Sequence, residues 1–191
     1  MTEVELFEQT ISWLRDNYNK YTFFVERDIV WTIQTQMWKS IREMHLPCRV
    51  FNEYPMIAGK RQVDLAIVDL KDQVEVAVEF KYEPSRARTG KDIDPKKTKF
   101  PVTEWNRGVA EDIAKIHQYV VDEQACFAYS IFVDEGGYFK KYKPHAGSVW
   151  LDWGNNIWIL YSKAPVEPQN KVESQRNAPN ACKAPLWNAL G

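Results

Sequence analysis

Two β-type runs around a short polar break constrain the fold of this chain more than any other stretch. They lie within Gln62–Tyr82, which reads QVDLAIVDLKDQVEVAVEFKY, and span Val63–Asp69 and Val74–Tyr82. The polar residues 70–73 between them suit a hairpin loop. The stretch therefore predicts two antiparallel strands, with a turn that closes between Asp69 and Val74.

This closure fixes the pairing register, because the residue numbers of antiparallel partners then sum to 143 (69 + 74). The predicted pairs are Val68–Glu75, Ala66–Ala77 and Asp64–Glu79. Lys81 lies two residues beyond Glu79 and therefore projects from the same face as Glu79 and Asp64. The opposite, core-facing side is predicted to carry Val63, Leu65, Ile67, Val76, Val78 and Phe80.

The predicted Asp64–Glu79 pair needs a compensating charge. Facing side chains on neighbouring strands have Cβ atoms roughly 4.5–5.5 Å apart, so two carboxylates there repel each other. The apolar neighbours indicate burial, which raises the cost of unpaired charge. A hard cation such as Mg²⁺ would compensate, since it takes carboxylate oxygens and keeps waters. The alternative is a buried ion pair of Lys81 with either carboxylate, without chemistry.

An Asp followed, after fourteen residues, by Glu-Phe-Lys at the end of a hairpin resembles the PD-(D/E)XK nuclease superfamily. The matching residues are Asp64 and Glu79-Phe80-Lys81; Val63 stands where the superfamily usually has proline. The resemblance spans roughly residues 23–133 and implies a restriction-endonuclease-like fold. It also implies a Mg-dependent, endonuclease-like hydrolysis of nucleic-acid phosphodiester bonds, with DNA as the expected substrate.

The resemblance also implies a role for each site residue. Asp64 and Glu79, with the Phe80 carbonyl, would hold Mg²⁺ or Mn²⁺. Lys81 would orient or help deprotonate the attacking water and stabilise developing charge. Many members carry an acidic residue on the helix before the sheet, and Glu26 fits that position. Without the resemblance, Glu26 is explained by its place in the first turn of a helix, where the helix dipole favours negative charge.

The remaining pattern predicts one α/β domain over residues 1–163 and a tail over residues 164–191. Predicted helices are Glu3–Tyr21, with a Thr2/Glu5 capping box, Phe24–Met44 and Trp105–Asp122. The other predicted strands are Cys48–Met56, Gln124–Val133, which is expected to be central in the sheet, Val149–Trp153 and Ile157–Tyr161. A crossover through the third helix predicts a parallel strand beside the hairpin, giving a mixed sheet with helices on both faces.

Further polar residues are candidates for the site. The third predicted helix offers Asp112, Lys115, His117 and Gln118, and the sequence does not choose among them. Asp112 and Lys115 are spaced to pair locally. Residues 83–104 lack periodicity and hold basic side chains predicted to contact phosphates, unless the segment is only a solvated loop. These basic residues are Arg86, Arg88, Lys96, Lys97 and Lys99.

Composition restricts the class of protein less than the Asp64 and Glu79-Phe80-Lys81 motif does. The formal net charge of −1 gives no basic footprint, although acidic ligands can offset a local basic patch. The histidines show no zinc-ligand spacing, and no signal peptide or long apolar span predicts membrane contact, so a cytoplasmic protein is expected. A homodimer is left open. Alternatives are a non-cleaving nucleic-acid-binding module, a structural protein with an ion-pair cluster, and an enzyme for another phosphate substrate.

Overall fold

The computed structural model describes residues 1–57, 61–86 and 101–164 of the chain. Its helices are α1 (Glu3–Asn17), α2 (Glu26–Met44) and α4 (Ala110–Val121). Its strands are β1 (Cys48–Ile57), β2 (Arg61–Asp69), β3 (Val74–Glu83), β4 (Phe127–Glu135), β5 (Ser148–Asp152) and β6 (Ile157–Ala164). The strands form one six-stranded sheet in the order β1-β2-β3-β4-β6-β5.

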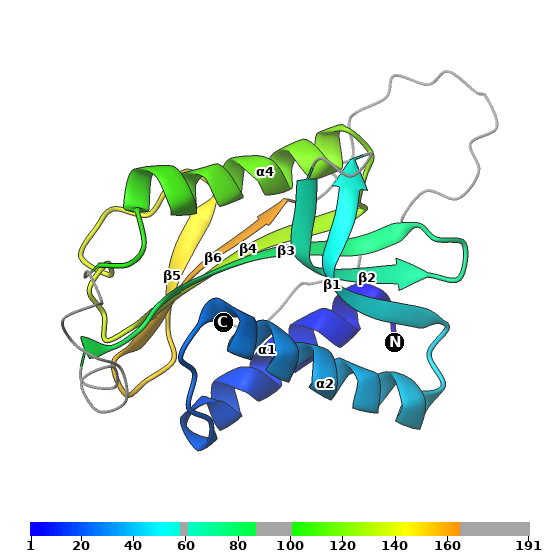
Figure 1. The fold of residues 1–191 in the computed structure, drawn as a ribbon, viewed down its shortest axis with the longest axis horizontal. Helices are drawn as coiled ribbons and strands as arrows, with labels where there is room; N and C mark the ends of the chain where they lie inside the picture. The colour runs from blue at the N-terminus through cyan, green and yellow to red at the C-terminus, as the bar shows by residue number, and fades with distance from the viewer. Residues whose placement is uncertain (58–60, 87–100, 165–191) are drawn as a thin grey trace, which may run out of the picture.

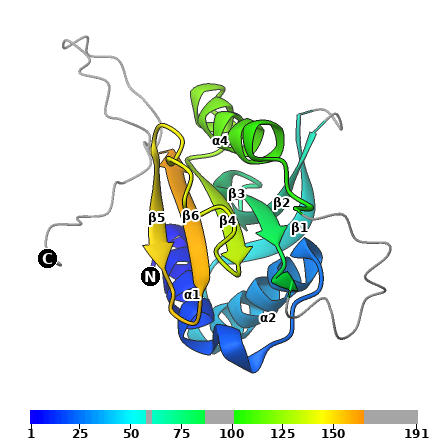
Figure 2. The same cartoon turned by 90° about the vertical axis from the view of Figure 1, so that its left-hand side faces the viewer.

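The sheet is mixed and is covered by helices on both faces, as the sequence predicts. Strands β3 and β4 are parallel, whereas the other neighbouring strands are antiparallel. Helices α1 and α2 cover one face and α4 covers the other (Figures 1 and 2). The predicted α/β class is therefore confirmed, including the parallel strand beside an antiparallel hairpin.

The two N-terminal helices start where side-chain caps fix them. The predicted capping box is present: Glu5 N–H donates to Thr2 Oγ1, and Thr2 N–H donates to the Glu5 carboxylate. Helix α2 begins at Glu26, two residues after the predicted start. The Asp28 carboxylate accepts N–H bonds from Phe24 and Val25, which holds those two residues outside the helix. Glu26 is thereby the first residue of α2 and lies at its positive end.

The β2–β3 hairpin follows the predicted register through its middle but not at its turn. Leu65–Val78, Ala66–Ala77 and Ile67–Val76 pair as the sum of 143 requires, whereas Val68 pairs with Val74 instead of the predicted Glu75. The turn is tighter because Asp69 Oδ1 accepts N–H bonds from Lys71 and Gln73 at 2.8 and 2.9 Å. Because Val68 pairs with Val74 and Ile67 pairs with Val76, Glu75 has no partner in the ladder and forms a bulge.

The crossover from β3 to β4 brings α4 over the predicted polar face. The segment begins with a π-helical turn, Trp105–Val109, and continues directly into α4. In the parallel register Lys81 lies beside Phe132 and Glu83 beside Asp134. The carboxyl ends of β3 and β4 therefore meet at the same end of the sheet.

Apolar side chains form separate cores on the two faces of the sheet. Leu65 and Ile67 pack with α1 and α2, as predicted. The alternation predicts Val63 on the same side, but this prediction is wrong: Val63 packs with Ala66 and with Ile116 of α4. Alternation is therefore broken between Val63 and Leu65, at Asp64.

The described part of the sheet runs to Ala164. Strand β6 ends there, paired to β4 through Ala128–Ala164. The tail predicted over residues 164–191 otherwise lies outside the described residues. Within the described ranges, no helix is long and apolar enough to cross a membrane.

Candidate active site

Asp64 lies where β2 parts from β3: the β2–β3 ladder ends at Leu65–Val78, whereas the β1–β2 ladder resumes beyond Asp64 at Tyr54–Val63. By the register of each ladder, Asp64 would face Glu53 of β1 and Glu79 of β3, yet neither pair forms. Glu53 has a φ of 49°, which takes β1 out of extended conformation at this level. Instead, Asp64 Oδ2 accepts the backbone N–H of Phe80 at 2.6 Å. A side chain thus replaces the backbone partner that β3 loses when β2 diverges.

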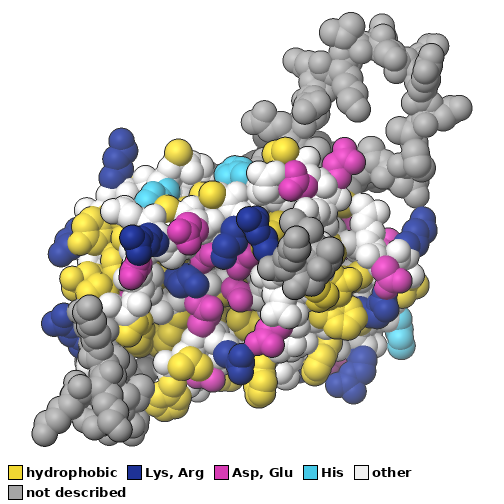
Figure 3. Space-filling view, turned by 45° about the horizontal axis from the view of Figure 1, so that its top comes forward, with side chains coloured by type: hydrophobic (Ala, Val, Ile, Leu, Met, Phe, Trp, Pro, Cys, Tyr) yellow, Lys and Arg dark blue, Asp and Glu magenta, His cyan; other side chains and the backbone are white. Residues whose placement is uncertain are grey.

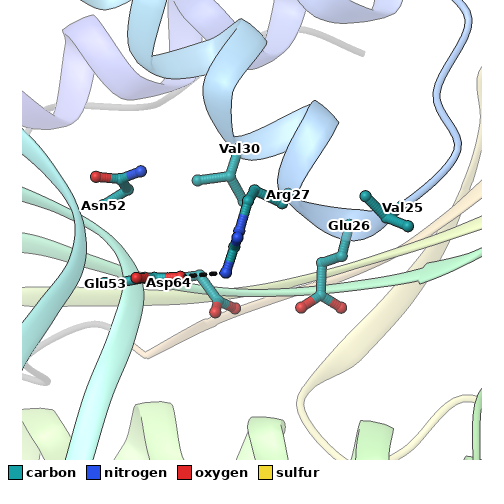
Figure 4. Close-up of a pocket in the computed structure, with 7 residues that line it drawn as sticks. All are labelled: Val25, Glu26, Arg27, Val30, Asn52, Glu53 and Asp64. Carbon is teal, nitrogen blue, oxygen red and sulfur yellow. Dashed lines mark hydrogen bonds and ion pairs between the residues drawn. The ribbon is translucent and has the colours of Figure 1, made fainter.

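The opening beside Asp64 is a cavity of about 450 Å³ under the first turn of α2. Its lining residues are Val25, Glu26, Arg27, Val30, Asn52, Glu53 and Asp64. The carboxylates of Glu26 and Asp64 point into this space from α2 and β2, respectively (Figure 4). Glu53 is more than half exposed and pairs with Arg27 at 2.7 Å. Glu26 therefore lines the same cavity as Asp64.

Glu79 is buried under α4, with 4% of its surface exposed. Its Oε1 accepts a hydrogen bond from the Tyr119 hydroxyl at 2.7 Å, and its Oε2 lies 4.0 Å from Lys115 Nζ. Burial, reinforced by the nearby charge of Asp64, raises the pKa of Glu79 to about 7. Glu79 therefore holds a proton for part of the time at neutral pH unless another cation approaches.

Lys81 bridges the helices on the two faces of the sheet. Its Nζ lies 3.5 Å from Glu26 Oε2 on α2 and 3.4 Å from Asp112 Oδ2 on α4. Burial lowers the pKa of Lys81, but the charges of Asp112, Glu26 and Asp64 outweigh burial, and the pKa is raised overall. Lys81 is therefore a cation at neutral pH rather than a base.

Asp112 and Lys115 are the residues of α4 that reach the site. They pair at 2.6 Å, as their spacing predicts. Asp112 is 3% exposed, and its Oδ2 makes no hydrogen bond among the described residues. Two other candidates on this helix lie elsewhere: Gln118 bonds Asp122, and His117 lies near Gly147. The spacing of Asp112 and Lys115 was the sequence signal for this pair. Only the position of α4 over β3 distinguishes the pair from the other polar residues of the helix.

Carboxylates outnumber cations in this cluster. Glu26, Asp64, Glu79 and Asp112 face Lys81 and Lys115, so full ionisation leaves four negative charges against two positive ones. Burial raises the pKa of Glu26 to about 7 and also raises that of Asp64. Figure 3 shows acidic and basic side chains interspersed across the middle of one face of the molecule. The raised pKa values of Glu26, Asp64 and Glu79 indicate that an additional cation would stabilise their ionised forms.

No family model, curated protein or solved structure matches this chain. The likeness to the PD-(D/E)XK superfamily therefore depends on Asp64, Glu79, Phe80 and Lys81 themselves. Among the residues that the structure describes, no three His, Cys, Asp or Glu side chains stand ready around one ion. Asp64 and the backbone of Phe80 nevertheless meet at the edge at which β2 leaves β3, and Glu79 is near enough for the charge of Asp64 to raise its pKa.

The oxygen atoms of Asp64, Glu79 and the Phe80 carbonyl are ligands that suit a hard divalent cation. All are oxygens, the cluster carries excess negative charge, and Asp112 Oδ2 is buried without a hydrogen bond. Mg²⁺ commonly uses one or two protein carboxylates and completes its coordination with water and substrate phosphate. A site of Asp64 and Glu79 fits that habit. The Phe80 carbonyl faces the same strand edge as the Phe80 N–H, because both groups of one residue point the same way in a strand.

The predicted nucleic-acid-binding residues divide into two groups. Arg86 is exposed, and its guanidinium lies over the Tyr138 ring, 6.0 Å from the centroid. The others are outside the described residues: Arg88, Lys96, Lys97 and Lys99. The described chain resumes at residue 101 beside the end of β3, where the Glu83 carboxylate accepts the N–H of Thr103 at 2.8 Å.

Proposed function

We propose that this chain is a metal-dependent nuclease with a restriction-endonuclease-like fold, acting on phosphodiester bonds in DNA. The observation that carries the proposal is the contact of Asp64 with the backbone of Phe80. It sets one carboxylate beside the Glu79-Phe80-Lys81 strand, at a gap in the sheet that is open to a cavity. An ion-pair cluster needs no such gap, whereas a reacting phosphate does.

In this proposal Asp64 and Glu79, with the Phe80 carbonyl, hold Mg²⁺ or Mn²⁺. The bound metal would polarise a phosphoryl oxygen and lower the pKa of a coordinated water. Tyr119 orients Glu79 through its 2.7 Å hydrogen bond. The Phe80 N–H holds one oxygen of Asp64, which directs the other oxygen toward the opening.

Lys81 acts as a fixed cation. Its ammonium group has donors but no acceptor, so it can donate to a water or to a phosphate oxygen and cannot ligate a metal. Glu26 and Asp112 hold it from opposite sides at 3.5 and 3.4 Å. Because its pKa is raised, Lys81 stabilises the charge that develops on the phosphate, and it orients water rather than deprotonating it. Lys115 shares the Asp112 carboxylate with Lys81: it pairs with Oδ1 at 2.6 Å, while Lys81 lies 3.4 Å from Oδ2.

The direct test is cleavage of supercoiled plasmid DNA with Mg²⁺, with Mn²⁺ and with a chelator. Wild type is expected to cleave only with a divalent ion, and Glu79→Gln is expected to lose that activity. The matched control is Glu75→Gln, which changes a carboxylate on the same strand, nearer to the β2–β3 turn. Plasmid that stays intact with wild type and both ions contradicts the proposal and favours the non-cleaving module.

A further inference from the structure

A second feature of the molecule lies beyond the end of β4, in the loop over residues 136–143. Asp134, which has no exposed surface, fixes this loop from inside. Its carboxylate accepts backbone N–H bonds from Tyr138, Phe139 and Lys140 at 2.9, 2.6 and 3.1 Å. Gly137 turns the chain with a φ of 66°, a conformation that L side chains rarely adopt. The loop backbone is thereby set by a buried anchor.

The outer side of this loop alternates cations and aromatic rings. Lys141 Nζ lies over the rings of Tyr138 and Tyr142, 5.1 and 5.6 Å from their centroids. Lys140 Nζ lies 4.5 Å from the ring centroid of Trp158. Arg86 reaches the Tyr138 ring from the end of β3. We define the basic–aromatic rim as Arg86, Tyr138, Lys140, Lys141 and Tyr142.

Cation–ring contacts restrain the long basic side chains of the rim. Arg86, Lys140 and Lys141 are nevertheless exposed to solvent. Two carboxylates beneath the loop are turned inward: Asp134 is occupied by backbone N–H groups, and Glu135 accepts from the Tyr82 hydroxyl at 2.6 Å. The rim therefore presents its positive charges to solvent while these two carboxylates lie buried beneath it.

The rim borders the candidate active site through the strands. Glu83 pairs with Asp134 in the parallel register, two residues beyond the Lys81–Phe132 pair. At about 3.3 Å per residue and 4.8 Å between strands, Asp134 lies on the order of 8 Å along the sheet from Lys81.

The rim also meets the site through the π-helical turn before α4. Trp105 stacks on Phe139 and Tyr142, with ring centroids 5.6 and 5.5 Å apart. Three residues further on, Gly108 lies against Lys81: a Cβ there would be 3.8 Å from Lys81 Cε. The same turn thus supports the loop on one side and flanks the proposed catalytic lysine on the other.

We infer that the basic–aromatic rim binds the sugar–phosphate backbone of double-stranded DNA on one side of the bond to be cleaved. The inference rests on the proposed function, since nearness to Lys81 is what selects a nucleic acid over an acidic protein. The ring of Tyr138 is contacted by Lys141 and Arg86, and that of Tyr142 by Lys141 and Trp105, which makes both rings poor platforms for unpaired bases. Recognition by charge on a fixed loop suits a regular duplex, independent of base sequence.

The experiment measures binding without cleavage. Affinity for a labelled duplex of about 20 base pairs, and for one of its strands alone, is followed by fluorescence anisotropy in chelator over a series of salt concentrations. The test variant is Lys140→Gln/Lys141→Gln. The matched control is Lys39→Gln/Lys71→Gln, which removes the same charge from exposed positions on α2 and at the β2–β3 turn. Thermal melts of both variants verify folding.

The duplex is expected to bind wild type more tightly than the single strand does. The rim variant is expected to lower the magnitude of the slope of log K against log salt by about 0.9 for each phosphate that it no longer neutralises, hence by up to about 2. The control pair should leave the slope unchanged. An unchanged slope in the rim variant, equally weakened binding in both variants, tighter binding of the single strand, or no binding of duplex by wild type would overturn the inference.

The two proposals fail separately. Wild-type protein that binds duplex through the rim but cleaves nothing with Mg²⁺ or Mn²⁺ refutes the nuclease and leaves the rim intact. Cleavage by wild type, together with an unaltered salt slope in Lys140→Gln/Lys141→Gln, refutes the rim and leaves the nuclease intact. Lys141→Glu is a second variant; it should weaken duplex binding more than Lys141→Gln because it adds repulsion to the loss of attraction.

Discussion

The backbone N–H of Phe80 donates to Asp64 Oδ2 at 2.6 Å, so a side chain of β2 takes the place of a backbone partner of β3. The sheet is not closed at this level, and the carboxylate is held at the edge of the gap. Burial is the largest influence on Asp64 and raises its pKa, while the Phe80 N–H favours the ionised form. A divalent cation in the gap would favour that form further.

We predict that Mn²⁺ and Mg²⁺ stabilise the wild-type protein and that Asp64→Asn removes most of this effect. A ligand at a concentration 100 times its Kd raises the free energy of unfolding by about 2.7 kcal/mol. Differential scanning fluorimetry with and without metal measures the shift in Tm. Glu75→Gln serves as the control and should keep the full shift. An equal metal-dependent shift in Asp64→Asn would place the ion elsewhere or nowhere specific.

Lys81→Met should abolish cleavage while leaving metal-dependent stabilisation in place. Methionine keeps much of the apolar stem, and Lys81 cannot ligate metal while protonated. The side chain is 31% exposed, so we expect a loss of stability of about 1 kcal/mol rather than the full cost of stranding a buried charge. A structural ion-pair cluster gives a different result: a loss of roughly 3–5 kcal/mol that metal does not restore. Chemical denaturation with and without Mn²⁺ separates the two.

Tyr119→Phe should weaken metal binding without displacing Glu79 from the core. The hydroxyl that this variant removes donates to Glu79 at 2.7 Å and lowers its pKa, so the variant raises that pKa further. More metal is then needed at neutral pH to displace the proton, and removing the hydrogen bond costs about 1 kcal/mol of stability. Isothermal titration with Mn²⁺ measures the affinity, with the exposed Tyr142→Phe as control. Equal affinities in the two variants would mean that Tyr119 does not act through Glu79.

The metal-free protein should lose stability as the pH rises toward neutrality. Glu26 and Glu79 have folded-state pKa values of about 7 against 4.5 for the free side chain, so the folded state binds more protons between these values. Their contribution is fully present below about pH 4.5 and is lost as the pH rises through about 7. Melts in chelator across this window should show the fall, and Glu79→Gln should flatten it. Saturating Mn²⁺ should suppress it, because metal replaces the proton.

The sequence by itself determined the regular parts of the fold. Period-2 alternation in Val74–Tyr82, helical periodicity in residues 3–21 and the Thr2–Glu5 spacing are local patterns, and they predicted the hairpin, the first helix and its capping box. The predicted register holds through Ala66–Ala77, beyond the bulge next to the turn. The side-chain turn at Asp69, which shifted the Val68 pair, depends on which backbone N–H groups come within reach, and alternation does not encode that.

The tertiary structure alone decided what surrounds the motif. Asp112, Lys115 and Tyr119 reach the site because the crossover sets α4 over Glu79 and Lys81. The sequence named two of these among several candidates and missed Tyr119, since helical spacing fixes a face but not the strand that the face meets. The break at Asp64, which sends Val63 to the opposite core, was also not predicted. The break at Asp64 arises where β2 parts from β3. Its position depends on the contacts of β2 with both β1 and β3, which the sequence pattern does not encode.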